Sequence, residues 1–115
     1  MFDSVSATAL GSALDGLAAR QRATADNIAN INTPGFLAGR TDFESSLRGE
    51  LENGEAATVG GGTTARSLAA TRTDGNNVDL DSETVIATET GMRYQLALSA
   101  LDGKYSLLKS ALRTA

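Results

Sequence analysis

The sequence predicts an all-α fold: an elongated antiparallel pair of long N- and C-terminal helices, packed like a coiled coil and joined by a partly disordered loop. Three observations support this prediction. Apolar residues repeat at steps of three and four through the first 31 residues, and again from residue 81 onward. The segment between these stretches is rich in glycine, threonine and serine. Tryptophan is absent and most apolar side chains are aliphatic, which favours helix-on-helix packing over a wide core.

The first predicted unit, residues 1–35, contains a long helix and the turn that ends it. Its apolar residues follow a heptad spacing in which two polar residues, Gln21 and Thr24, interrupt the series. Alanines surround this series, and their small side chains allow a neighbouring helix to come close. We therefore predict that one helix seam contains Leu10, Leu14, Leu17 and Ile28.

A cluster of asparagine, proline and glycine follows this helix and predicts a sharp end to it. Pro34 lacks an N–H group and disfavours an α conformation in Thr33, while Gly35 adopts a positive φ without penalty. We call this cluster the Asn-Pro-Gly turn, and its residues are Asn27, Asn30, Asn32, Thr33, Pro34, Gly35 and Phe36.

The second predicted unit, residues 36–80, is a variable connection. Residues 41–52 predict a short helix, because Phe43, Leu47 and Leu51 recur at a spacing of four. Thr41 is its expected N-cap, with Glu44 three residues later completing a capping box. Residues 53–77 contain too few apolar side chains to offset the entropy of ordering, so we predict a flexible loop there.

The third predicted unit, residues 81–115, is the C-terminal helix, and the three units together form one structural domain. Asp81 is its expected N-cap. An unbroken series of steps of four and three predicts a seam that contains Tyr94, Leu98, Leu101, Tyr105, Leu108 and Leu112.

Other apolar side chains of this helix lie away from the seam. One helical partner covers a stripe about 100° wide, so it cannot cover both sets. We predict that the second set faces other subunits, unless the short helix at 41–52 and Phe36 fold back over it. This predicted inter-subunit face contains Val85, Ile86, Met92, Leu96 and Leu107.

Several kinds of function are disfavoured by composition. The chain has no histidine and no cysteine, which excludes imidazole bases and thiolate nucleophiles, and we expect no enzyme activity, cofactor or metal site. Asp79, Asp81 and Glu83 are the one acidic cluster, and they fit helix capping better than calcium ligation. A net charge of −4 argues against nucleic-acid binding. No stretch has the roughly 18 apolar residues of a membrane span, and we see no secretory signal peptide.

Residues 26–36, Asp-Asn-Ile-Ala-Asn-Ile-Asn-Thr-Pro-Gly-Phe, resemble the signature near the N-terminus of flagellar rod and hook proteins. Residues 74–83, with 92–95 and 103–105 downstream, resemble the proximal rod subunits of that family. The resemblance implies a structural subunit of the bacterial flagellar basal body, located in the cell envelope outside the cytoplasmic membrane. It implies export through the flagellum's own channel without a cleaved signal peptide. The implied partners are copies of itself, other rod subunits, and the membrane-ring and export-gate proteins at the rod base.

One alternative class remains open at this point. A soluble helical adaptor, or a binding module like an export chaperone, also needs long amphipathic helices. Such a module stays at a fixed stoichiometry with one partner, whereas a rod subunit shows concentration-dependent association.

Overall fold

The protein, described here by a computed structural model, has its residues 2–54 and 63–114 placed in the structure. Part of the predicted flexible loop, residues 55–62 with the glycine triplet, lies outside these described residues. The elements in chain order are α1 (Phe2–Ala29), β1 (Gly39–Asp42), α2 (Glu44–Glu52), β2 (Thr63–Arg66) and α3 (Leu80–Thr114).

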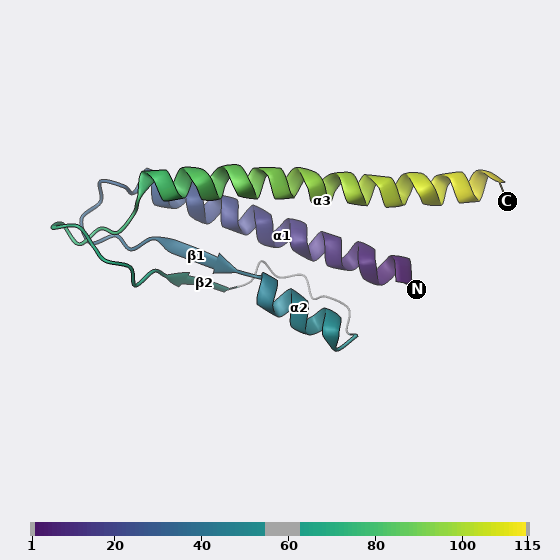
Figure 1. The fold of residues 1–115 in the computed structure, drawn as a ribbon, viewed down its shortest axis with the longest axis horizontal. Coiled ribbons are helices and arrows are strands. Elements are labelled where there is room, and N and C mark those ends of the chain that lie inside the picture. The colour runs from purple at the N-terminus through teal and green to yellow at the C-terminus, as the bar shows by residue number, and fades with distance from the viewer. Residues whose placement is uncertain (1, 55–62, 115) are drawn as a thin grey trace.

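Helices α1 and α3 run antiparallel along the molecule and confirm the predicted fold class (Figure 1). The strands and α2 lie along one side of α1, and α3 continues past the N-terminal end of α1 (Figure 1). The molecule measures 66 × 26 × 15 Å, and its radius of gyration is 17.7 Å. A compact chain of this length has a radius of about 13 Å, so the fold is a rod rather than a globule.

The sequence analysis predicted no strand, and the structure contains a small antiparallel sheet. Strand β1 pairs with β2 in a register that runs from Gly39 opposite Arg66 to Asp42 opposite Thr63. The hydroxyl groups of Thr41 and Thr64 lie 3.0 Å apart across the pair. The predicted flexible segment is therefore ordered in its described second half, because β1 supplies hydrogen-bond partners for it.

Helix α2 begins at Glu44, three residues later than predicted. Thr41 belongs to β1, so the predicted capping box is wrong. Asp42 takes over part of this role, since its carboxylate accepts a hydrogen bond of 2.9 Å from the Ser45 hydroxyl. Phe43, at the N-cap position, is buried against α1, where a Cβ atom at Gly16 would collide with its ring.

The N-cap of α3 is Asp79, not Asp81 as predicted. The Asp79 carboxylate accepts a hydrogen bond from the Ser82 hydroxyl at 2.7 Å and another from the Asp81 N–H at 3.3 Å. The Ser82 hydroxyl lowers the pKa of Asp79, which keeps the cap negatively charged. Asp81 stands inside the first turn, where a negative charge favours the helix dipole.

The buried part of the molecule contains few apolar side chains and an unusual share of polar ones. Leu17, Ala38, Phe43 and Val78 are the described hydrophobic residues with less than a tenth of their surface exposed. The polar residues buried to the same degree are Ser12, Thr24, Asn27, Thr41, Asn76, Glu83 and Thr90. Among the described helices, none combines the length and the apolar character that crossing a membrane requires.

Candidate functional site

Three of the buried polar residues, Asn27, Asn76 and Glu83, lie where α1 ends and α3 begins, at the closed end of the molecule, which is the end away from the two chain termini (Figure 1). With the half-buried Asn77 they form what we call the asparagine junction: Asn27 on α1, Asn76 and Asn77 before α3, and Glu83 in the first turns of α3. The junction joins the two sequence blocks, residues 26–36 and 74–83, that were singled out above.

Asn76 fastens the Asn-Pro-Gly turn to the start of α3. Its side-chain amide donates to the carbonyl oxygens of Asn30 and Thr33, each at 2.9 Å. Its side-chain oxygen accepts the Val78 N–H at 2.7 Å. One fully buried side chain thus satisfies backbone groups from segments more than 40 residues apart, as the hydrogen-bonding of buried polar groups requires.

Asn77 fastens the strands in the same way. Its side-chain oxygen accepts the Ala38 N–H at 2.7 Å, and its amide donates to the carbonyl oxygens of Ser67 and Ala69 at 3.1 and 3.2 Å. The entrance to β1 and the exit from β2 are therefore held by one residue.

Asn27 attaches β1 to α1. Its side-chain oxygen accepts the Gly39 N–H at 2.8 Å and its amide donates to the Gly39 carbonyl at 3.0 Å. The same amide donates to the carboxylate of Glu83 at 3.1 Å, and the Arg40 guanidinium lies 2.6 Å from the other oxygen of that carboxylate. Glu83 is fully buried, so this pairing offsets the cost of removing its charge from water.

Two glycines allow the backbones to meet at the junction. Gly35 and Gly75 have φ of +74° and +82°, values that side chains rarely tolerate. The Gly35 N–H donates to the Asp74 carbonyl at 2.9 Å, and a Cβ atom on Gly75 would lie 3.3 Å from the Gly35 Cα. The predicted positive φ at Gly35 is confirmed.

The other residues of the Asn-Pro-Gly turn lie at the surface or near it. The Asn30 amide donates to the Asp26 carbonyl at 2.8 Å, and the Thr33 hydroxyl donates to the Asn30 side-chain oxygen at 3.1 Å. Asn32 and Pro34 are exposed, and the Arg66 guanidinium lies over the ring of Phe36. Only Asn27 of the three predicted asparagines is buried.

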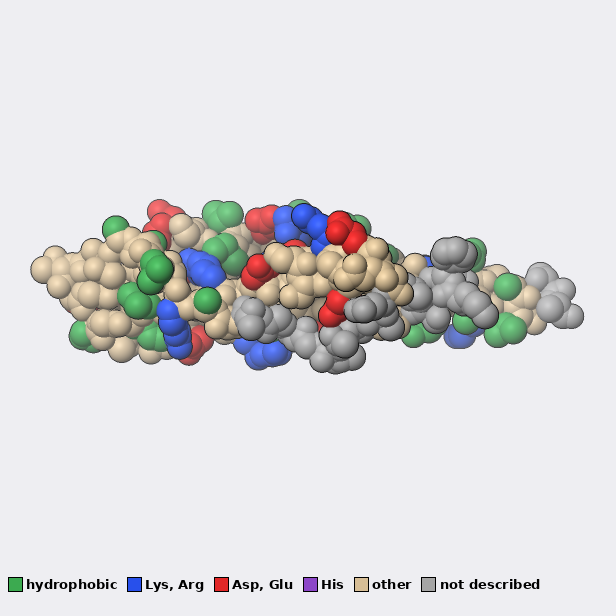
Figure 2. All heavy atoms as spheres, turned by 90° about the horizontal axis from the view of Figure 1, so that it is seen from below, with side chains coloured by type: hydrophobic (Ala, Val, Ile, Leu, Met, Phe, Trp, Pro, Cys, Tyr) green, Lys and Arg blue, Asp and Glu red, His purple; other side chains and the backbone are tan. Residues whose placement is uncertain are grey.

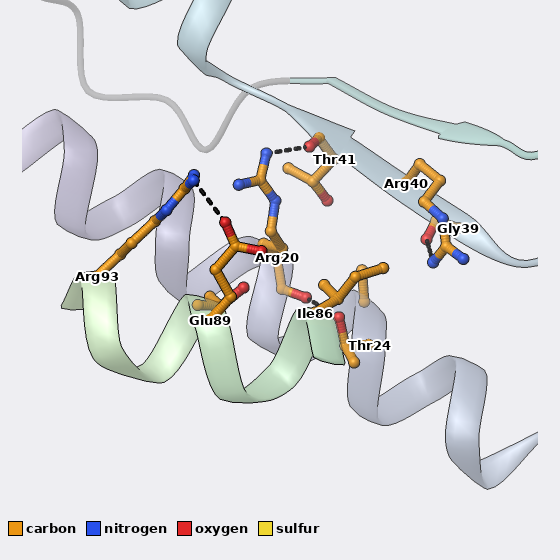
Figure 3. Close-up of a pocket in the computed structure, with 10 residues that line it drawn as sticks. Arg20, Thr24, Gly39, Arg40, Thr41, Ile86, Glu89 and Arg93 are labelled. Atoms are coloured by element: carbon orange, nitrogen blue, oxygen red, sulfur yellow. Dashed lines mark hydrogen bonds and ion pairs between the residues drawn. The ribbon is translucent and has the colours of Figure 1, made fainter. Parts of the chain in front are cut away.

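A cavity of about 200 Å³ lies between α1, β1 and α3 (Figure 3). Arg20 reaches across it from α1, donating to the Thr41 carbonyl at 2.7 Å and to the Glu44 carboxylate at 2.7 Å. These hydrogen bonds raise the pKa of Arg20 and lower the pKa of Glu44. Arg40 and Arg93 pair with Glu83 and Glu89. Each arginine around the cavity is thus matched by a carboxylate, and the pairs of Arg20 and Arg40 join different elements across it.

The described residues contain no group of three histidine, cysteine, aspartate or glutamate side chains arranged to hold a metal ion. The sequence analysis included Asn76 and Asn77 in the predicted flexible loop of residues 53–77, and it missed their role in the junction. It missed Arg20 as well. The available signal was the pair of adjacent asparagines before the helix, but their partners Ala38, Thr33 and Asn30 lie 39 to 46 residues earlier in the chain.

The predicted seam residues occupy different environments along the rod. Leu17 is buried, and Leu10, Leu14 and Leu101 are half-buried. The other seam residues are exposed, both beside α1 and toward the C-terminal end of α3, where α3 extends beyond α1 (Figure 1). The exposed members are Ile28 on α1 and Tyr94, Leu98, Tyr105, Leu108 and Leu112 on α3.

The predicted inter-subunit face is largely open to solvent. Val85, Met92, Leu96 and Leu107 are each more than 60% exposed. Ile86 differs, because it is half-buried and lines the cavity shown in Figure 3. The remaining four residues form what we call the outer face of α3. Within the described residues, neither α2 nor Phe36 covers them.

Comparison with known proteins gives concordant matches. Residues 8–36 match the family described as flagella basal body rod protein. The flagellar basal body rod protein FlgB of Yersinia enterocolitica is 33% identical over 121 residues, spanning 88% of each chain. FlgB of Escherichia coli K12 is 30% identical over 125 residues, spanning 89% of this chain and 88% of the relative. FlgB of Bacillus subtilis 168 is 29% identical over 119 residues, spanning 90% and 89%.

Proposed function

The chain belongs to the FlgB family of flagellar basal body rod proteins, and from this membership we propose that it is a structural subunit of the proximal rod. In this role it assembles through its two long helices. The asparagine junction fixes where α1 ends and where α3 begins. It thereby sets the position of the exposed apolar side chains along the length of the molecule.

One observation supports the assembly role most directly. Apolar side chains are exposed on two sides of α3, the outer face and the uncovered part of the seam. Monomeric proteins rarely expose contiguous apolar patches beyond a few hundred Å². A subunit in a helical wall meets neighbours on several sides, and each neighbour covers one stripe. A module with one partner, by contrast, needs only one uncovered stripe.

The finer parts of the proposal concern location and partners. The subunit lies outside the cytoplasmic membrane, and it reaches this location through the flagellar export channel. It contacts its own copies, other rod subunits, and the ring and export-gate proteins at the rod base. It performs no chemical reaction, in keeping with the paired charges around the cavity of Figure 3.

Deletion of the gene, followed by complementation, tests this function. We expect cells without the protein to lack a completed rod and to be non-motile, and the wild-type gene to restore both. An epitope-tagged chain should co-purify with isolated basal bodies. Normal motility in the deletion strain, or a tagged chain that complements yet stays out of purified basal bodies, would overturn the proposal.

A further inference from the structure

The closed end of the molecule, where α1 ends and α3 begins, has a shallow groove with an apolar floor. The groove has a volume of about 410 Å³ and is lined by Ile31, Ala70, Arg72, Asn77, Val78, Asp79 and Leu80. Leu80 is half exposed. Leu68, on the loop that supplies Ala70, is 95% exposed. Hydrophobic side chains are visible on the surface around this end in Figure 2.

The loop that carries Leu68 is held in place on both sides. The Asn77 amide donates to the carbonyl groups of Ser67 and Ala69, the residues flanking Leu68. The Arg72 N–H donates to the Asn76 carbonyl at 2.8 Å. An exposed leucine on a fixed backbone is preorganised for contact, because little conformational entropy is lost when a partner covers it.

The rim of the groove is acidic. Arg72 is the cation in the lining, but its guanidinium donates to the carbonyl oxygens of Val78 and Ile31 and lies 3.9 Å from the Asp74 carboxylate. Asp79 in the lining and the neighbouring Asp81 form no ion pair with a described cation, although, besides the Ser82 hydroxyl, the charge of Arg72 helps to lower the pKa of Asp79. Together with Asp74, three carboxylates thus stand in or beside the groove against the single guanidinium of Arg72, which leaves an excess of negative charge. The groove therefore suits an apolar segment that brings its own positive charge.

The opposite end of the rod has the complementary chemistry. Leu108 and Leu112, four residues apart and exposed, form one stripe near the C-terminal end of α3, and this end of the helix extends beyond α1 (Figure 1). Lys109 and Arg113 form the adjacent stripe. Every charged residue from 103 to 113 is basic.

We propose that the C-terminal end of α3 of one copy docks into the closed-end groove of a second copy, with leucines on the apolar floor and cations against the acidic rim. The inference rests on the proposed function, and it names a site for self-association that the function alone leaves unspecified. The contact is heterologous, because one copy contributes its α3 end and the other its groove. A dimer therefore keeps one unoccupied groove and one unbound α3 end. Repetition of such a contact produces a filament rather than a closed dimer.

Two end-specific variants test the contact. Leu68→Lys replaces the exposed leucine on the loop that supplies Ala70 to the groove, and its positive charge repels the basic end of α3. The double variant Lys109→Glu with Arg113→Glu reverses the charge of the docking helix. Sedimentation velocity of each purified full chain should show a monomer of 11.8 kDa at the lowest concentration. Wild type should associate with rising concentration, and less so in salt on the order of 0.5 M, where charges are screened within a few Å. Each variant should weaken association by about tenfold or more.

Mixing the two variants gives the decisive result. The groove of the charge-reversed variant and the helix of the Leu68→Lys variant are both intact, so the mixture should form one-to-one dimers that grow no further. Leu51→Lys, which changes an exposed leucine on α2, is the matched control and should associate like wild type. Circular dichroism checks that all variants keep wild-type helix content.

A wild-type chain that remains monomeric at its highest soluble concentration would overturn this contact, as would a mixture that stays monomeric or variants that associate normally. These outcomes are separable from failure of the proposed function. A chain that complements motility but gives a monomeric mixture retains the function and loses the contact. A mixture that dimerises while the chain is absent from basal bodies retains the contact and loses the function.

Discussion

The choice of asparagine at the junction follows from its amide group, which both donates and accepts hydrogen bonds. Asn27 pairs with the N–H and the C=O of Gly39, as a neighbouring strand would. It thereby satisfies the edge of β1 that faces α1. An aspartate at this position accepts but cannot donate when ionised, and an alanine leaves both backbone groups unpaired.

Replacement of Asn27 by alanine should destabilise the fold by roughly 2–4 kcal/mol, because buried donors and acceptors lose their partners at about 1–3 kcal/mol for each group. Urea denaturation followed by circular dichroism measures this loss. Asn32→Ala is the control, since Asn32 is an exposed asparagine of the same turn, and it should change stability by less than about 0.5 kcal/mol. Equal effects of the two substitutions would contradict the role assigned to Asn27.

The pairing of Glu44 with Arg20 predicts a pH dependence. Hydrogen bonding to Arg20 lowers the pKa of Glu44 below its ordinary value of 4.5 in the folded state. The unfolded state therefore binds the proton more tightly, so the stabilisation is present above pH 4.5 and is lost as pH falls through the lowered value. Melting temperatures between pH 6 and 3 should fall more steeply for wild type than for Glu44→Gln. Parallel curves for the two proteins would show that the ion pair contributes nothing.

At the scale of elements, the two long helices were predictable because their periodicity is local and extends over many turns. The two strands were not. Each has four residues without apolar alternation, and β1 owes its place to Asn27 on α1, 12 residues before Gly39. The helix starts were displaced for a similar reason. Thr41 and Asp81 are good caps by residue type, but strand pairing and the Asp79–Ser82 hydrogen bond decide which residue takes the role.

The junction itself was predicted only as the Asn-Pro-Gly turn and the end of a flexible loop, without any contact between the two. Asn76 donates to the carbonyl of Asn30, which lies 46 residues earlier in the chain. Sequence patterns that span a few turns of helix or strand cannot predict a contact between residues so far apart. The position of α2 depends on Phe43, whose ring packs on Gly16 and beneath the Arg20 guanidinium. Gly16 lies within α1, and its role emerges only from this contact.

Gly16 and Gly11 should respond to alanine in opposite directions. A Cβ at Gly16 collides with the Phe43 ring, so Gly16→Ala should destabilise the protein by about 1–3 kcal/mol despite the better helix propensity. A Cβ at Gly11 meets nothing within 4 Å, so Gly11→Ala should stabilise α1 by roughly 0.5–1 kcal/mol. Denaturation midpoints compare the two variants. Stabilisation by both substitutions would mean that Phe43 does not pack on α1 in solution.

The two apolar sides of α3 should separate folding from assembly. Leu101→Asp places a charge in the half-buried seam and should reduce the helix content measured by circular dichroism. The double variant Leu96→Ser with Leu107→Ser changes exposed residues of the outer face, so it should keep its helix content yet block motility in complemented cells. If the double variant loses helix while Leu101→Asp retains it, the two faces have been assigned the wrong way round.

At the scale of the whole molecule, a long rod with four well-buried hydrophobic residues among those described has little internal core. Ordering the chain costs about 1–2 kcal/mol for each residue, and apolar burial must offset this cost. Assembly supplies the missing burial, because α3 keeps its apolar side chains available for neighbours. We therefore expect the free subunit to be only marginally folded and the assembled one to be rigid.

A density map of the isolated basal body, with this chain traced in it, tests the central claim most directly. The account predicts that the chain lies in the proximal rod, with Met92, Leu96 and Leu107 of the outer face buried against neighbouring subunits and the asparagine junction formed as in the free chain. A rod traced completely without this chain would contradict the account. The same holds for a map in which the chain is present but its outer face points into solvent.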